Sequence, residues 1–193
     1  MKNTVLAGIL LLILHTASAQ TDRTSWLVGG NAGLDFTDHA SSNSLNISLS
    51  PQAGYFVVDN LAVGLTLPFS LIIDKSNILT IDGKEATTRT RTYTVGLGPF
   101  ARYYFGLSAI RPFVEAGANY RITNAKTKSY DIEATSNEDS YSVSGSAGLV
   151  YFISNHVGLE TKLGYTYFRG DNLNKYSTLG LTVGFQVYLP GKE

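Results

Sequence analysis

The stretch LNISLSPQAGYFVVDNLAVGLTLPFSLII (residues 45–73) decides the fold, because almost every odd position in it is apolar. The even positions are mostly small or polar, with Ser48, Gln52 and Thr66 as examples. Alternation with a period of two predicts β-strands that each have one apolar face. Asp59 and Asn60 predict a tight turn that divides the stretch into two strands. The alternation alone leaves open whether the apolar faces point into a protein core or outward to lipid.

Extended segments with this alternation cover most of the chain. We expect eight of them, at residues 25–36, 45–58, 61–73, 89–105, 110–123, 140–153, 156–169 and 175–189. Short connections (59–60, 106–109, 154–155) alternate with longer ones (37–43, 74–88, 124–139, 170–174). This order predicts a single all-β domain whose antiparallel strands run up and down. Pro51 and Pro68 cannot donate ladder hydrogen bonds, so we expect a bulge or a strand end at each.

The N-terminus has the pattern of a signal peptide. Lys2 is followed by an apolar run at residues 5–14 and by Ala17-Ser18-Ala19, which fits a cleavage site. We expect residues 1–19 to be removed and residues 20–193 to form the exported domain. A retained membrane anchor is the alternative, although the run is short for a membrane span.

The two faces of the expected strands differ in bulk. The apolar faces carry Leu, Val, Ile and Tyr, whereas the polar faces are rich in Gly, Ser, Thr and Ala. The lumen of an eight-stranded barrel is just wide enough to be filled by side chains, so the small residues fit inside it. Apolar faces outside and polar faces inside are typical of outer-membrane barrels. We therefore expect an eight-stranded antiparallel up-and-down transmembrane β-barrel.

Aromatic residues on the apolar faces gather near the strand ends. The expected aromatic girdle comprises Trp26, Tyr55, Tyr103, Phe105 and Tyr151 near the short turns, and Phe36, Phe69, Tyr93, Tyr120, Tyr141, Tyr165 and Tyr167 near the longer connections. Two aromatic belts that flank an aliphatic band are typical of the two interfaces of a bilayer.

Charged residues of both signs lie on the polar faces. The expected lumen ion-pair network comprises Arg102, Arg111, Glu115, Arg121, Glu160 and Lys162. Unpaired charges are costly in a narrow lumen, so we favour a network that closes it over a selectivity element of a small pore. Arg89 and Arg91 share the parity of the apolar face, where they either meet lipopolysaccharide phosphates or remain solvated.

Two motifs resemble a known family. GYFVVDNLAVGL (residues 54–65) is similar to the hairpin G-Y-F-x-x-D-N-L-A-x-G-L of the small outer-membrane β-barrel family, the porin-superfamily group with OmpA- and OmpX-like barrels. LTVGFQVYL (residues 181–189) is similar to the C-terminal assembly signal of such proteins, although family members commonly end on an aromatic residue. The resemblance implies eight strands, periplasmic termini, short periplasmic turns and exposed surface loops.

The sequence offers little for catalysis or metal binding. The chain has no cysteine, and after cleavage its histidines, His39 and His156, fall at opposite ends of the expected barrel. Ser154 lies near His156, but no acid is placed beside them to complete a triad. We expect no cofactor, no metal and no enzymatic activity, and a lipid hydrolase at the rim is the least favoured alternative.

The expected function is an integral outer-membrane scaffold with a packed polar lumen, which displays surface loops for adhesion or other interactions, or supports envelope integrity. The alternatives are a narrow porin-like channel and a soluble periplasmic lipocalin-like binder. Expected partners are outer-membrane lipid, lipopolysaccharide and, during biogenesis, the barrel-assembly machinery. Balanced charge, 15 Lys and Arg against 15 Asp and Glu, argues against nucleic acid. We expect a monomer, because a closed barrel has no free strand edge.

Overall fold

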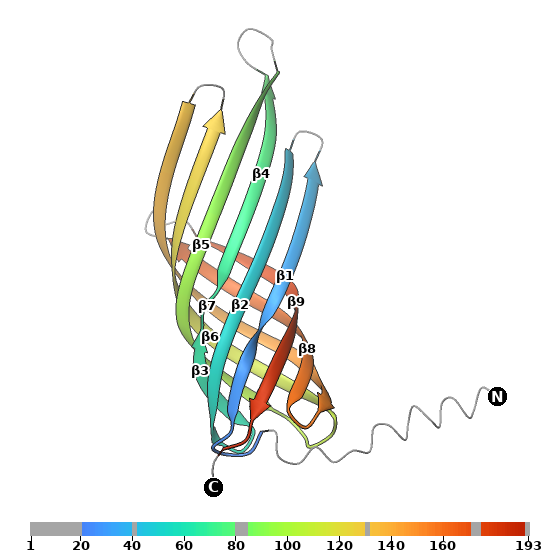
Figure 1. Cartoon of the computed structure of the whole chain (residues 1–193). Coiled ribbons are helices and arrows are strands. Elements are labelled where there is room, and N and C mark those ends of the chain that lie inside the picture. The colour runs from blue at the N-terminus through green and yellow to red at the C-terminus, as the bar shows by residue number, and fades with distance from the viewer. Residues whose placement is uncertain (1–20, 40–41, 80–84, 130–131, 171–174, 192–193) are drawn as a thin grey trace, which may run out of the picture.

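The computed structural model describes residues 21–39, 42–79, 85–129, 132–170 and 175–191. The chain forms nine strands: β1 (Trp26–His39), β2 (Ser42–Val58), β3 (Leu61–Thr66), β4 (Phe69–Leu79), β5 (Glu85–Tyr104), β6 (Ile110–Ser129), β7 (Ile132–Ser154), β8 (Val157–Gly170) and β9 (Lys175–Leu189). Neighbouring strands pair antiparallel, and β1 also pairs with β9, which closes the sheet into a ring (Figure 1). Among the described residues, no helix is long and apolar enough to cross a membrane. The predicted signal peptide and its cleavage site lie outside the described residues.

Strands β3 and β4 together form one barrel strand, which is interrupted at Leu67 and Pro68. Both pieces pair with β2 on one side and with β5 on the other. The register against β2 is the same on both sides of the interruption, with Gln52 opposite Thr66 and Leu49 opposite Phe69. The ring therefore has eight strand positions, and the predicted eight-stranded antiparallel up-and-down barrel is confirmed.

The two prolines of this region behave differently. Pro68 interrupts its strand as expected, whereas β2 continues through Pro51, which pairs with Gly30 in unbroken register. The backbone N–H of Leu67 donates to the carbonyl of Pro51 at 2.8 Å. In antiparallel strands the N and C=O of one residue point to the same neighbour, so the donor that Pro51 lacks would also face Leu67. The expected bulge or strand end at Pro51 was wrong, because its missing bond falls where the ladder is already interrupted.

The strands continue well beyond the expected ones, through most of the predicted connections at 74–88 and 124–139. Strands β4 and β5 meet across residues 80–84, and β6 and β7 meet across residues 130–131. Hydroxyl pairs join β5 to β6 in this part, namely Thr88–Ser129 at 2.9 Å, Thr90–Thr127 at 3.1 Å and Thr94–Thr123 at 3.1 Å. The expected strands are shorter than the observed ones, because apolar alternation indicates only the part of a strand that faces lipid. Figure 1 shows these strands projecting beyond the ring.

The tight turns gather at the end of the barrel where β1 begins and β9 ends, which we call the turn end (Figure 1). Asn60 has a positive φ of 66°, a conformation that Asn tolerates better than most residues. The segment that precedes β1 is tied to this end, because Asn60 N–H donates to the carbonyl of Thr21 at 2.7 Å and Thr24 N–H donates to that of Phe56 at 2.9 Å. The opposite end, where β4 and β6 end and β5 and β7 begin, we call the loop end.

Gly98 permits a close approach of β5 and β6 beside Pro99. A Cβ at position 98 would lie 1.8 Å from the carbonyl oxygen of Ala118, so the backbone would have to shift. We predict that Gly98→Ala lowers the free energy of unfolding by about 3 kcal/mol, the upper end of the usual cost of overpacking. The measurement is urea unfolding after refolding into lipid vesicles. Gly145→Ala is the matched control, because a Cβ there meets nothing within 4 Å; equal losses in both variants would contradict the prediction.

Candidate functional site

The centre of the lumen holds four charged side chains of balanced sign. Arg102 from β5 contacts Glu115 from β6 and Glu160 from β8, and the Nζ of Lys162 lies 2.7 Å from Glu115 Oε1. The side chains of Arg102 and Glu160 are fully buried, and those of Glu115 and Lys162 are 12% and 15% exposed. Two cations and two carboxylates thus neutralise each other within the lumen. The structure thus brings together four of the six residues of the predicted network.

Arg102 uses all five of its N–H groups. Nε and Nη2 donate to Glu115 Oε2, Nη1 donates to Glu160 Oε2 at 2.7 Å, and Nη2 also reaches Glu160 Oε1 at 3.3 Å. The second N–H of Nη1 donates to the Tyr104 hydroxyl at 3.1 Å. The guanidinium carbon also lies 4.4 Å from the centre of the Phe113 ring, a cation–π distance. A buried arginine is tolerated when its donors and its charge are satisfied in this way.

Arg111 and Arg121 lie away from this network, towards opposite ends of the lumen. Arg111 donates from Nη1 to the Thr21 hydroxyl at 2.7 Å and from Nε to the carbonyl of Ser108 at 3.1 Å. Its guanidinium carbon lies 4.9 Å from the Phe152 ring centre, and that of Arg121 lies 4.9 Å from the Phe168 ring centre. Each of these two arginines therefore packs on an aromatic ring.

An aromatic cluster fills the lumen at the turn end, where a polar filling was expected. It consists of Phe56, Phe100, Tyr104, Phe113, Phe152 and Tyr188, together with Leu27, Ala62 and Val150. The hydroxyls of Tyr104 and Tyr188 lie 3.1 Å apart and satisfy each other. Consecutive aromatics at 55–56, 103–105 and 151–152 were the missed signal: in a strand, one of two adjacent side chains must point inward. The expected polar lumen is thus apolar at one end.

Thr21 adds to the closure of the turn end. It is only 2% exposed, and its hydroxyl donates to Asn60 Oδ1 at 2.6 Å while it accepts from Arg111. The N-terminal segment thereby connects a turn of the barrel to a lumen arginine. The turn end is closed by aromatic rings from the strands and by this hydrogen-bonded segment.

The structure places the twelve residues of the expected aromatic girdle on the outer surface. Eleven of them are between 37% and 67% exposed, and Tyr55 is half-buried against Trp26, with ring centres 5.2 Å apart. On three strands an aromatic at each end is separated by ten positions: Trp26 and Phe36, Tyr93 and Tyr103, Tyr141 and Tyr151. Ten residues of a strand tilted by about 40° span about 25 Å, the height of the apolar band of outer-membrane barrels.

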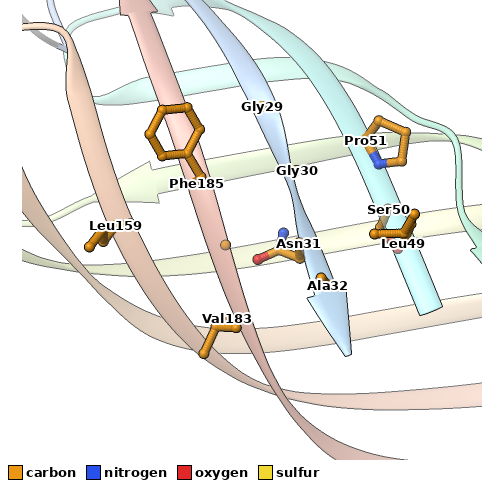
Figure 2. A pocket seen from close by; sticks show the side chains of 11 residues that line it. Gly29, Gly30, Asn31, Ala32, Leu49, Ser50, Pro51, Leu159, Val183 and Phe185 are labelled. Carbon is orange, nitrogen blue, oxygen red and sulfur yellow. The ribbon is translucent and has the colours of Figure 1, made fainter. Parts of the chain in front are cut away.

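The outer wall is hollowed over β1, where a groove of about 500 Å³ lies between β2 and β9 (Figure 2). Gly30 and Ala32 occupy its floor, with Pro51 on one side and Phe185 on the other. A Cβ at Gly30 would lie 2.8 Å from the Cα of Pro51, so glycine is needed for this approach. The groove is lined by apolar groups without an ionisable side chain.

The residues of the rim-hydrolase alternative lie at a tight turn. The backbone N–H of His156 donates to the Ser154 hydroxyl at 3.2 Å, and both residues are exposed. His39 ends β1 at the loop end, far along the barrel from His156. Within the described part of the chain, no group of three or more His, Cys, Asp or Glu residues is arranged to hold a metal. The absence of enzymatic activity stays a prediction.

Comparison with known proteins bears directly on this geometry. Residues 4–186 match the family described as outer membrane protein beta-barrel domain. The chain belongs to this family. Membership confirms the expected resemblance to small outer-membrane barrels, and with it the location of the protein in the bacterial outer membrane.

Individual proteins agree with this assignment. An uncharacterized protein of Haemophilus influenzae is 27% identical over 173 residues, which cover 86% of this chain and 89% of the relative. The crystal structure of Neisserial surface protein A (NspA) matches with a TM-score of 0.51 at 17% identity, over 84% of this chain and 94% of its own. OprG of Pseudomonas aeruginosa matches with a TM-score of 0.52 at 15% identity, over 90% and 99%. At these identities the two structures support the fold alone.

In an outer-membrane barrel the exposed apolar wall faces lipid. Leu34, Leu179 and Leu181 are 71%, 70% and 68% exposed, and they share the outward face with the aromatic girdle. The alternative of a soluble lipocalin-like binder was wrong, because it requires these side chains to line the interior. The groove over β1 lies in the same wall.

Arg102 offers a test of the buried network. Arg102→Met leaves two carboxylates facing a single Lys162, and loss of one partner of a buried pair typically costs about 3–5 kcal/mol. We predict a loss of that size in the free energy of unfolding, measured by urea titration in lipid vesicles. The control is Arg102→Met combined with Glu160→Met, which leaves the neutral Glu115–Lys162 pair; it should unfold with more than half of the loss restored. A double variant as unstable as the single one would refute the electrostatic account.

Proposed function

We propose that the protein is a membrane-embedded scaffold with a closed lumen, which displays its projecting strands at the cell surface. The observation that carries this proposal is the fully buried Arg102 at the centre of the barrel, which is held by Glu115 and Glu160 and lies over the Phe113 ring. Below it the aromatic cluster occupies the turn end. Side chains thus occupy the lumen at two successive levels, which supports a closed lumen.

The projecting part of the barrel supports a display role. Strands β5, β6 and β7 have 20, 20 and 23 residues, about twice the length needed to cross a membrane. Beyond Tyr120 and Tyr141, β6 and β7 pair for nine further positions, to Ser129 opposite Ile132. A stiff, hydrogen-bonded ribbon holds its exposed side chains in a defined order. This supports a role in adhesion, in another surface interaction or in envelope integrity.

The proposed partners follow from the same arrangement. Outer-membrane lipid and lipopolysaccharide surround the wall, and the barrel-assembly machinery acts on the chain during biogenesis. The outward alternation of Phe185, Val187 and Leu189 on the last strand supports the latter. The first and last strands pair over seven positions at the turn end, residues 26–32 against residues 183–189, and this closure of the ring supports a monomer.

Conductance distinguishes the scaffold from the narrow channel. We predict that the wild-type protein, reconstituted in planar bilayers, produces no stepwise current at physiological salt. Because Glu115 is partly exposed towards the lumen, Glu115→Gln would alter the current of a real pore. Steps in the wild type that change in this variant would overturn the closed lumen and establish the channel.

The orientation is tested separately by cysteine labelling, which is clean because the chain has no cysteine of its own. Thr135→Cys lies on projecting β7 and Asn155→Cys lies at the turn between β7 and β8, and both positions are exposed. We predict that a membrane-impermeant maleimide labels Thr135→Cys on intact cells. Asn155→Cys should react only after the outer membrane is opened. The reverse pattern would overturn the surface display.

A further inference from the structure

Five exposed cationic side chains lie together on the outer face of β4, β5 and β6: Lys75, Arg89, Arg91, Lys126 and Lys128. We call them the basic patch. Arg89 pairs in register with Lys75 on one side and with Lys128 on the other, and Arg91 pairs with Lys126. Like charges directly opposite each other in a sheet are destabilising. The patch therefore lowers the stability of the isolated protein.

Neutralising groups on the protein itself are few. Within the described residues, the ion pairs of the basic patch are limited to one, between Lys128 and Glu133 of β7. Both of its side chains are highly exposed, at 67% and 70%, so water screens this contact. Four cations are left with side chains directed away from the barrel. Such a surface is stabilised when an anion with several charges binds across it.

The position of the basic patch along the barrel indicates which kind of anion it can bind. Arg91 stands two residues beyond Tyr93 on the same outward face, which places it about 7 Å further along the strand. Tyr93 belongs to the belt that marks the outer limit of the apolar band. The patch thus begins where hydrocarbon ends and polar head groups begin, and its long side chains extend along this boundary.

We propose that the basic patch binds the phosphate groups of lipopolysaccharide in the outer leaflet. Arginine offers a planar fork that matches phosphate oxygens, and lysine adds point charges around it. Three neighbouring strands present cations in two rows, which suits a lipid whose phosphates are held by one glycolipid core. The proposal deepens the scaffold function, on whose surface orientation it rests: a bound glycolipid fixes the height of the barrel in the membrane and anchors the base of the projecting strands.

The test compares two pairs of charge removals. Arg89→Gln with Arg91→Gln removes the centre of the basic patch, and Arg169→Gln with Lys175→Gln removes an exposed cationic pair on β8 and β9. Binding of fluorescent lipopolysaccharide to the protein folded in zwitterionic detergent is followed by fluorescence anisotropy. We expect about 30-fold weaker binding for the first variant, because each of its two lost cations contributes about 1 kcal/mol and every 1.4 kcal/mol corresponds to about tenfold. We expect near wild-type binding for the second variant.

Two further measurements separate phosphate recognition from general attraction. Dephosphorylated lipopolysaccharide should bind the wild type as weakly as intact lipopolysaccharide binds the first variant. Phosphatidylglycerol micelles should bind weakly to every variant. Equal losses in the two pairs of variants, or undiminished binding of the dephosphorylated lipid, would overturn the proposal.

The outcome is separable from that of the scaffold function. Binding in detergent does not depend on orientation or conductance, so the cysteine-labelling and bilayer results stand by themselves. Labelling of Thr135→Cys on intact cells, combined with lipopolysaccharide binding that is unchanged by loss of the basic patch, would overturn this binding site and still support the scaffold function. Both folded variants should keep the heat-dependent gel shift of the wild type, which shows that lost binding is not lost structure.

Discussion

The narrow lumen of an eight-stranded barrel places the strictest demand on this chain, because a charged side chain that points into it without an opposite charge is costly. Arg102 meets this demand with five donated hydrogen bonds and the charges of Glu115 and Glu160. Apolar side chains could fill the same space, but both faces of the strands would then be apolar. A shift of the strand register by one residue would then cost little free energy, whereas in this protein the same shift would turn Arg102 towards lipid. The buried charges therefore help to specify which face of each strand points inward.

The kind of side chain that fills the lumen changes along the barrel axis. Aromatic rings close the turn end, ion pairs occupy the centre, and threonine and serine pairs line β5 and β6 towards the loop end. Arg102 joins the first two zones, since its guanidinium bonds Glu160 and Tyr104 and also lies over Phe113. The charged and aromatic parts thus pack as one unit. Loss of either would leave the other with unsatisfied groups or with open space.

Much of the fold could be predicted from the sequence, because a wall between lipid and a polar lumen imposes a period of two on every strand. The ends of the strands could not be predicted in this way. The projecting part contains the hydroxyl pairs Thr88–Ser129 and Thr90–Thr127, and its strands need no apolar face. Pro51 could not be placed either, because the cost of its missing donor depends on the break opposite it at Leu67.

The lumen was predicted less completely than the wall. Opposite charges on inward positions indicate that pairs form, and Arg102, Glu115, Glu160 and Lys162 do lie together. Which arginines take part depends on depth along the barrel, and parity carries no information on depth. Arg111 lies beside Thr21 at the turn end, close to the ring of Phe152. Phe152 was not predicted to point inward, because its neighbour Tyr151 was expected on the outer face and the lumen was expected to be polar.

Strand β5 shows how one face can serve two environments. Its outward side chains are aromatic and aliphatic from Tyr103 to Tyr93 and then become cationic at Arg91 and Arg89. Parity does not change, and β6 remains the neighbour on one side. The pairing with β6 is antiparallel in both parts, so the medium outside the barrel accounts for the change. Hydrocarbon excludes charge, whereas a layer of phosphorylated head groups attracts it. If the basic patch binds phosphorylated head groups as proposed, the point at which the side chains change marks the depth at which the lipid chains end.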